Sequence, residues 1–494
     1  MANLKELAKK KEVLTGGHRL CSGCGAPIII RQMGLSQDVP LVVGCATGCV
    51  EVSTTPNPFT AWECSFVHCA FENSAATVSG AEAAYKSLKR RGKVKAELRF
   101  VAIGGDGGTY DIGLQSLSGM LERGHRILYL CYNNEAYMNC LSASSMIMTK
   151  KGLKKITEIK EGDEVYAFDQ NAHGLVLKRC TGVFDNGKKE IFQLDTLHHS
   201  IRATGNHPFL VLKRNGTGRQ NNFAWKMLEE IKIGDEIVVL KSLNGIDELP
   251  YKRNEKKKGL VSIDGSKAVA TAVELSEEPL TYEINKYFET EKVVSIKSVG
   301  IEPTLDLRVE GEHNFIADGI VVHNTGVQRS SATPRGTQTT TAPVGAKSIG
   351  KKQYPKDLTG IVVAHRIPFA AQASPSHWND LITKSQKALS VDGPSFMNVL
   401  SPCPLGWAYP PEKTIELAKL AVDTCFWPLF EVENGTTWKL SYKPAAKKPI
   451  TDYLKVQGRF RHLLRPENAS VVEEIQKRID DDWAALLRRC GVED

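Results

Sequence analysis

The sequence predicts an α/β domain with a mainly parallel sheet that is split by an inserted all-β domain. Apolar strands that lead into glycine-rich turns and helical patterns occur on both sides of the chain, and short alternating strands fill its middle. In addition, the motif CYNNEAYMNC (131–140) stops midway, and VVHNTGVQRS (321–330) resumes it. We therefore expect residues 1–139 and 325–494 to form one domain and residues 140–324 to be an insert.

The composition favours a soluble cytoplasmic protein. Of the 494 residues, 41% are hydrophobic and 24% are charged, and no run of 18 apolar residues indicates a membrane span. The N-terminal segment lacks the apolar core of a secretory signal. The net charge of +8 lies outside the insert, which carries 26 Lys and Arg against 27 Asp and Glu. Twelve cysteines without an export signal favour metal binding or catalysis over disulfides.

A carboxylate and an amide are expected to meet at one edge of the predicted sheet. The segment LRFVAIGGDGGTYDIG (98–113) is a strand that enters a glycine-rich turn with Asp106 and continues as a helix. The next strand, RILYLCYNN (126–134), ends at an asparagine pair. The interval between the two motifs holds one helix and a return to a parallel strand, so Asp106 and Asn134 should lie at neighbouring carboxyl ends. Open α/β sheets bind ligands at that edge.

This arrangement resembles the thiamine diphosphate motif. A carboxylate and a side-chain amide supply the hard oxygen ligands that Mg²⁺ prefers, and diphosphate oxygens complete its coordination. Gly105 and Gly107 would let the backbone approach the diphosphate closely.

The cysteine spacing indicates a metal site near the N-terminus. HRLCSGCGAP contributes Cys21 and Cys24 in a C-x-x-C pair, and Cys49 follows after 24 intervening residues. Such a loop directs two thiolates to one centre, which suits either an iron–sulfur cluster or zinc. Cys403 and Cys425 are the candidates for a fourth ligand. We favour Cys403, because it lies in a proline-flanked loop, whereas Cys425 ends a helical pattern and is expected in the core.

Taken together, these motifs resemble the beta subunits of 2-oxoacid:ferredoxin oxidoreductases, above all the pyruvate synthases. The resemblance covers 1–139 and 325–494, and joining them gives the continuous sequence NNEAYMNTGVQRSSATP. It implies thiamine diphosphate, Mg²⁺ and a [4Fe–4S] cluster as cofactors, and alpha, gamma and delta subunits, ferredoxin, a 2-oxo acid and coenzyme A as partners. The glutamate that activates the cofactor in this family lies on the alpha subunit. The implied ligands are Gly105, Asp106, Gly107, Asn134, the Ala136 carbonyl, Asn139 and Thr325 for Mg²⁺ and the diphosphate, and Cys21, Cys24, Cys49 and Cys403 for the cluster.

Three alternatives accompany this interpretation. The substrate could be a branched-chain 2-oxo acid such as 2-oxoisovalerate, although we favour pyruvate. The chain could be a zinc-binding scaffold with an inserted β-domain. It could also be a thiamine-dependent decarboxylase that acts alone, but the four cysteines oppose that.

The boundaries of the insert resemble those of an intein, a self-excising protein. The insert begins with Cys140 and ends with His323 and Asn324, and the hydroxyl-bearing Thr325 follows. Inside it, ATGNHPFLVL (203–212) carries a T-x-x-H motif. A simple domain insertion would not explain why the flanks rejoin in register at a cofactor motif.

The intein resemblance assigns the first chemical step to the N-terminal junction. The polarisable Cys140 thiol would attack the Asn139 carbonyl and exchange the amide for a thioester. His207 would donate to this amide and protonate its nitrogen, a role that suits a pKa near neutrality. Thr204 would orient His207.

The later steps belong to the C-terminal junction. Thr325 would accept the acyl group, and Asn324 would cyclise with help from His323 and release the insert. Asp306 and His313 resemble further positions that assist acyl transfer, although Leu305 stands where this family often has an aromatic residue. We find no endonuclease helices and interpret LNGIDELPYKRNEKKKGLVSIDGSK (243–267) as a linker, so we expect a mini-intein without a nucleic-acid partner.

Overall fold

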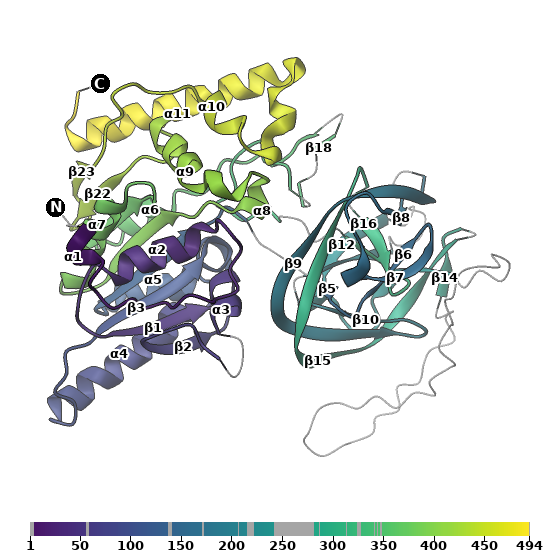
Figure 1. Ribbon diagram of the computed structural model, residues 1–494, viewed down its shortest axis with the longest axis horizontal. Coiled ribbons are helices and arrows are strands. Elements are labelled where there is room, and N and C mark those ends of the chain that lie inside the picture. Colours follow the sequence, from purple (N-terminus) through teal and green to yellow (C-terminus); the bar gives the residue numbers. More distant parts are fainter. Residues whose placement is uncertain are drawn as a thin grey trace. The chain divides into compact units, whose positions relative to one another are not determined.

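The chain forms two compact units, which are described separately (Figure 1). The host unit comprises residues 1–137 and 328–494, and the insert unit comprises residues 138–327. The computed structural model describes residues 4–493 except for 56–58, 137–140, 170–171, 206, 215–221, 242–280, 286, 313, 324–327, 340, 343 and 346–347. The predicted linker at 243–267 lies outside the described residues.

The host unit is built on an eight-stranded sheet in the order β2-β1-β3-β4-β21-β20-β22-β23. The first six strands pair in parallel and the last two are antiparallel, which confirms the predicted α/β fold with a mainly parallel sheet. Strands β3 and β4 precede the insert and β21 follows it, so the central sheet combines both parts of the sequence. The strands are β1 (Leu41–Ala46), β2 (Ser65–Cys69), β3 (Arg99–Gly105), β4 (Ile127–Asn133), β20 (Phe369–Ala373), β21 (Ser395–Leu400), β22 (Phe430–Glu433) and β23 (Thr437–Leu440), with a separate hairpin of β18 (Val344–Gly345) and β19 (Ser348–Ile349).

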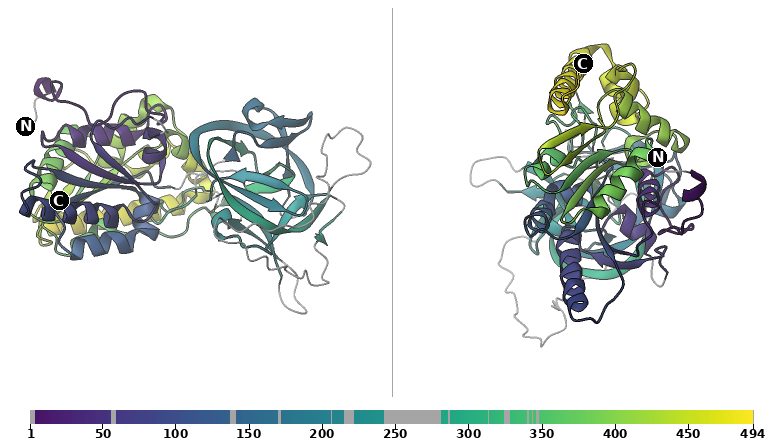
Figure 2. Two further views of the ribbon diagram at one scale, coloured as in Figure 1. Left: turned by 90° about the horizontal axis from the view of Figure 1, so that it is seen from below. Right: turned by 90° about the vertical axis from the view of Figure 1, so that its left-hand side faces the viewer.

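Helices cover both faces of this sheet, as Figures 1 and 2 show. Successive β3 residues alternate between two cores: Phe100 and Ala102 pack with helices α4 and α5, whereas Val101 and Ile103 pack with α2 and α7. Burial on both faces explains why the central strands are continuous apolar runs. The helices are α1 (Leu4–Leu7), α2 (Gly25–Gly34), α3 (Cys49–Thr54), α4 (Ser74–Arg90), α5 (Leu114–Glu122), α6 (Leu358–Val363), α7 (Trp378–Ser390), α8 (Pro404–Trp407), α9 (Thr414–Asp423), α10 (Ile450–Leu454) and α11 (Ala469–Cys490), with the π-helix η1 (Gly107–Ile112) and the 3₁₀ helices η4 (Pro411–Lys413), η5 (Gly458–Leu464) and η6 (Pro466–Asn468).

The described residues of the insert unit form a thirteen-stranded sheet whose pairings are all antiparallel, which confirms the predicted all-β insert. Its buried core is formed by apolar residues from alternate strand positions. The elements are β5 (Leu141–Ser142), β6 (Met146–Thr149), β7 (Gly152–Lys155), η2 (Ile156–Glu158), β8 (Glu164–Phe168), β9 (Leu175–Thr196), β10 (Ser200–Ala203), β11 (Pro208–Lys213), β12 (Asn222–Met227), η3 (Leu228–Glu230), β13 (Glu236–Leu240), β14 (Thr281–Glu283), β15 (Phe288–Val309), β16 (Asn314–Ala317) and β17 (Ile320–His323).

Two strands of the insert unit are longer than the sequence pattern predicts. β9 and β15 each span 22 residues and pair with each other over most of their length. Their register shifts at four places, and such bulges bend a paired ribbon so that it can curve around a core. Two of the predicted short strands, at 190–196 and 292–299, are therefore parts of two long, bent strands, whereas others such as β10, β11 and β13 are short as predicted.

Among the helices that the structure describes, none is both long and apolar enough to cross a membrane.

Candidate cofactor and splicing sites

Four neighbouring parallel strands of the host unit end at one edge of the sheet, and each is followed by a predicted site residue. In the order of the sheet, Cys49 follows β1, Asp106 follows β3, Asn134 follows β4 and Cys403 follows β21. Because parallel strands share a direction, their carboxyl ends lie together. The fold therefore gathers both predicted sites at one edge.

Asp106 and Asn134 are in direct contact. The backbone N–H of Asn134 donates to Oδ1 of Asp106 at 3.1 Å. Oδ2 of Asp106 is buried and has no hydrogen-bond partner among the described residues. Burial raises the pKa of Asp106 to about 7, since desolvation disfavours the carboxylate. A divalent cation would supply the missing partner and restore the charge, so this pair fits a cation site with oxygen ligands.

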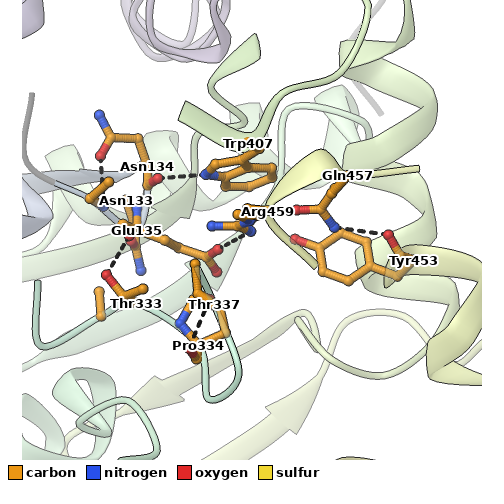
Figure 3. Close-up of polar contacts among 12 residues, drawn as sticks. Asn133, Asn134, Glu135, Thr333, Pro334, Thr337, Trp407, Tyr453, Gln457 and Arg459 are labelled. Atoms are coloured by element: carbon orange, nitrogen blue, oxygen red, sulfur yellow. Dashed lines mark hydrogen bonds and ion pairs between the residues drawn. The ribbon is translucent and has the colours of Figure 1, made fainter. Parts of the chain in front are cut away.

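The turn after β4 is held by polar contacts (Figure 3). The N–H of Ala136 donates to the side-chain oxygen of Asn134 at 3.2 Å. Between them, Glu135 has a φ of 62°, a left-handed conformation that is costly for residues other than glycine. Its buried carboxylate pairs with Arg459 at 2.6 Å, and the Thr333 hydroxyl donates to its carbonyl oxygen at 2.5 Å. The C-terminal part of the chain therefore maintains this turn.

Sequence reasoning misses two residues that complete the turn, Trp407 and Arg459. The indole N–H of Trp407 donates to the Asn134 carbonyl oxygen at 2.7 Å, and the Arg459 guanidinium lies 4.0 Å from the centre of its ring. Trp407 is the last residue of CPLGW, and its place four residues after the predicted ligand Cys403 could have indicated that it lies near the site. Arg459 has no such signal, because 324 residues separate it from Glu135.

Tyr132 is a third residue that the sequence did not single out, and it packs between the two candidate sites. A Cβ atom on Gly105 would lie 3.2 Å from the Tyr132 ring, and one on Gly48 would lie 2.6 Å from its hydroxyl. Glycine at these positions thus admits a buried aromatic ring that spans from the Asp106 turn to the Cys49 turn. The diphosphate contacts of Gly105 and Gly107 stay predictions.

The four predicted cluster ligands lie close enough to interact electrostatically. Burial raises the pKa of Cys24 well above its usual value, and the charges of Cys403, Cys49 and Cys21 raise it further. Burial likewise raises the pKa of Cys403 to about 12, with contributions from Cys49 and Cys21. Thiols that suppress one another's ionisation in this way are typical of a site that awaits positive charge, which a metal centre provides.

Backbone contacts explain how distant cysteines come together. The N–H of Gly25, next to Cys24, donates to the carbonyl oxygen of Pro402, next to Cys403, at 3.0 Å. Cys425 belongs instead to the apolar core around α9. Within the described parts of the chain, no three His, Cys, Asp or Glu side chains converge on a point suited to one metal ion.

In the insert unit, strand register brings the predicted splicing residues toward the N-terminal junction. Leu141 follows Cys140 in sequence and pairs with Ala203 on β10 and with Leu305 on β15. Thr204 and Asp306 directly follow these two partners, and both are buried. Five predicted site residues lie outside the described residues: Asn139, Cys140, His313, Asn324 and Thr325.

His207 and His323 lie near each other in the same unit. His323 ends β17, whose Val322 pairs with Phe209, and the backbone N–H of His207 donates to the Thr204 carbonyl at 2.9 Å. Burial lowers the pKa of His207 to about 3, and the charge of His323 lowers it further. The expectation of a pKa near neutrality is therefore wrong for the precursor, because full burial disfavours the imidazolium. At neutral pH this ring can donate only through the N–H of its neutral form.

The shifted pKa of His207 predicts an acid-sensitive insert. His207 takes up a proton near pH 6.5 in the unfolded chain but only near pH 3 in the folded chain. The folded insert therefore loses stability as the pH falls from 6.5 toward 3. At pH 4.5 we expect His207→Gln to recover about 2 to 3 kcal/mol of that loss. This loss of stability is measured by hydrogen exchange of β11 and β17 in a splicing-inactive precursor, with the exchange rates corrected for their intrinsic pH dependence. Equal pH dependence in both proteins would contradict the assignment.

Comparisons with known proteins agree with the two-unit structure. The family described as "Intein splicing domain" matches residues 146–324, and "Thiamine pyrophosphate enzyme, C-terminal TPP binding domain" matches residues 43–175. Pyruvate synthase subunit PorB of Thermotoga maritima is 34% identical over 499 aligned positions, which cover 98% of this chain and 95% of the relative. Ketoisovalerate oxidoreductase subunit VorB of Pyrococcus abyssi is 26% identical over 98% of this chain and 94% of its own. The crystal structure of Ssp DnaB mini-intein variant M86 covers 38% of this chain and 94% of its own, with 23% identity and a TM-score of 0.27.

The fold and the sequence matches define an α/β enzyme unit that binds thiamine diphosphate and is interrupted by an intein splicing domain. The chain belongs to the pyruvate synthase subunit PorB family, the beta subunits of 2-oxoacid:ferredoxin oxidoreductases. It is thus a subunit of a multi-subunit oxidoreductase and carries its own autocatalytic splicing element.

Proposed function

We propose that the chain excises residues 140–324 and that the ligated remainder is the beta subunit of a pyruvate:ferredoxin oxidoreductase. The observation that carries the proposal is the Asp106–Asn134 contact at the carboxyl edge of the sheet, where Cys49 and Cys403 follow neighbouring strands. In the reaction, a 2-oxo acid and coenzyme A yield acyl-CoA, carbon dioxide and a proton, and two electrons pass singly to ferredoxin.

The first part of this site would hold the cofactor. Asp106, Asn134 and the Ala136 carbonyl would bind Mg²⁺, and the buried, unpartnered Oδ2 of Asp106 fits that role. Thiamine diphosphate supplies a nucleophilic carbon and an electron sink for decarboxylation. The chain would hold the diphosphate of this cofactor through the cation. The further residues assigned to this task are Gly105, Gly107, Asn139 and Thr325.

The second part of the site would hold a [4Fe–4S] cluster on Cys21, Cys24, Cys49 and Cys403. The charges of these thiols affect one another, which supports a shared metal centre, and we favour a multi-iron cluster over the zinc alternative because the chain belongs to a family of 2-oxoacid:ferredoxin oxidoreductase subunits. Tyr132 then packs between the cluster and the diphosphate turn.

The substrate and partners follow from the relatives. We favour pyruvate, since the PorB relative is 34% identical and the ketoisovalerate subunit VorB 26%. Comparison of kcat/KM for pyruvate and 2-oxoisovalerate on the reconstituted enzyme tests this choice. The alpha subunit would supply the glutamate that activates the cofactor, and gamma and delta subunits and ferredoxin would complete the electron path.

Splicing would proceed by acyl transfer. The Cys140 sulfur attacks the Asn139 carbonyl, the amide bond breaks, and its nitrogen takes the thiol proton; His207 donates to this amide. The Thr325 hydroxyl then displaces the Cys140 thiol, giving an ester. The side-chain nitrogen of Asn324 then attacks the backbone carbonyl of Asn324, which forms a ring and breaks the bond to the Thr325 nitrogen. In the last step the freed Thr325 nitrogen displaces the ester oxygen and forms the Asn139–Thr325 amide. Thr204, Asp306, His313 and His323 are assigned to position these groups.

We expect serine at any of the four cluster positions to deplete iron. Cys21→Ser, Cys24→Ser, Cys49→Ser and Cys403→Ser should each lose most of the iron, labile sulfide and visible absorbance of the anaerobically purified subunit, because a hydroxyl is a poor ligand for iron in such clusters. Cys425→Ser is the matched control and should retain the cluster, since that thiol lies in the apolar core. Iron that persists without Cys403 but disappears without Cys425 would overturn the assignment, and stoichiometric zinc would favour the scaffold.

A further inference from the structure

The sheet of the host unit is already complete while the insert is still present. Strand β4, which precedes the insert, pairs in parallel with β21, which follows it, from Leu128–Ser395 to Asn133–Leu400. The two flanks of the insert therefore belong to one folded body before any splicing step.

A direct contact ties the upstream flank to the downstream flank. The Thr333 hydroxyl donates to the Glu135 carbonyl oxygen at 2.5 Å, as Figure 3 shows. Glu135 lies four residues before Asn139, and Thr333 lies eight residues after Thr325. This contact is buried, and both side chains of the adjoining Glu135–Arg459 pair are only 2% exposed.

Separate contacts anchor the downstream flank to the host unit. The buried Lys351 ammonium donates to the carbonyl oxygens of Ser330, Ser331 and Thr333 at 3.0, 3.3 and 2.5 Å. The Ser331 N–H donates to Asp111 on η1 at 3.1 Å. Both flanks are thus fixed to the same body by several buried or half-buried hydrogen bonds.

We propose that the Thr333–Glu135 contact is a splicing clamp, in which the folded host unit holds the two junction flanks together. The inference rests on the splice boundaries proposed above. About twelve residues of chain separate the contact from the two junctions, and a random coil of that length spans roughly 20 Å, which corresponds to a millimolar effective concentration of one end at the other. Acyl transfer from Cys140 to Thr325 needs both ends, whereas hydrolysis at either junction needs one. The clamp therefore favours ligation over cleavage, and Thr333 is a positioning residue.

Pulse–chase analysis of the full chain in cell-free translation tests the clamp. We expect Thr333→Val, which has the same shape but no hydroxyl, to slow ligation about fivefold, the effect of one hydrogen bond of about 1 kcal/mol. The fragments 1–139 and 325–494 should rise relative to the ligated product. Thr333→Ser should restore both the rate and the product ratio. Lys351→Met, which releases the downstream flank by a different change, should act in the same direction.

Thr424→Val is the matched control, because Thr424 is buried and its hydroxyl also donates to a backbone carbonyl, but in the α9 region away from the flanks. It should lower the thermal midpoint of the chain without changing the product ratio. The clamp is wrong if Thr333→Val and Lys351→Met splice like the wild type, or if Thr424→Val alters the product ratio equally. A wild-type chain that yields no ligated product would overturn the splice boundaries and the clamp with them.

Discussion

A chain that carries Cys140→Ala and Asn324→Ala should persist as a single species of 494 residues. The wild-type chain should instead yield a ligated product of 309 residues and a free insert of 185 residues, since the segment 140–324 is removed. The first substitution removes the nucleophile of the thioester step and the second removes the side chain that cyclises, so both junctions become inert. Intact mass of the expressed protein distinguishes these outcomes directly.

Cys180→Ala provides the matched control for loss of a thiol within the insert. Cys180 is buried on β9, and its sulfur contacts the Gly182 carbonyl oxygen at 3.3 Å, so it plays no part in the proposed chemistry. This variant should still give the 309- and 185-residue products. Splicing that continues in the double variant would show that other residues define the junctions.

The sheet edge that carries the cofactor site follows from local sequence features. The segment between the GDG turn and the asparagine pair is long enough for one helical stretch and the strand that follows it in parallel. The structure has η1 and α5 in this segment. Asp106 and Asn134 are therefore neighbours for a topological reason that the spacing alone conveys. Cys403 was favoured over Cys425 on similar grounds, because a loop after a strand can turn its side chains toward a site and a helix end in the core cannot.

The contacts that shape the site depend on tertiary structure and have no local signature. Glu135 adopts a left-handed φ, and its carboxylate pairs with Arg459, which is remote in sequence. The ring of Trp407 in turn covers the Arg459 guanidinium. Arg459 belongs to no motif with a spacing rule, and the place of Trp407 near Cys403 does not reveal that its ring covers Arg459. The pKa of His207 is similar in this respect: the T-x-x-H motif predicts its place, but only the packing around it determines that it is neutral far below pH 6.5.

The unspliced chain should lack oxidoreductase activity even when all partner subunits are present. In the precursor the Asp106–Asn134 contact is already formed, so we expect Mg²⁺ to bind. However, Asn139 is followed by Cys140 instead of Thr325, and the loop assigned to the diphosphate is interrupted by the insert. Misplacement by about 1 Å near a reacting centre can cost on the order of 10²-fold in rate, and interruption of a diphosphate loop exceeds that. We therefore expect at least a hundredfold loss.

The measurement compares the Cys140→Ala, Asn324→Ala precursor with a chain in which 1–139 and 325–494 are joined genetically. Each is combined with the alpha, gamma and delta subunits, and pyruvate- and coenzyme A-dependent reduction of a viologen dye is followed, together with calorimetric binding of thiamine diphosphate. The joined chain controls for the partner subunits and the assay, because it differs only by the insert. Since the sheet and the Asp106 turn are common to both proteins, a difference between them isolates the loop between Asn139 and Thr325. Rates within a few-fold of each other would mean that this loop tolerates the insert and that splicing is not what activates the enzyme.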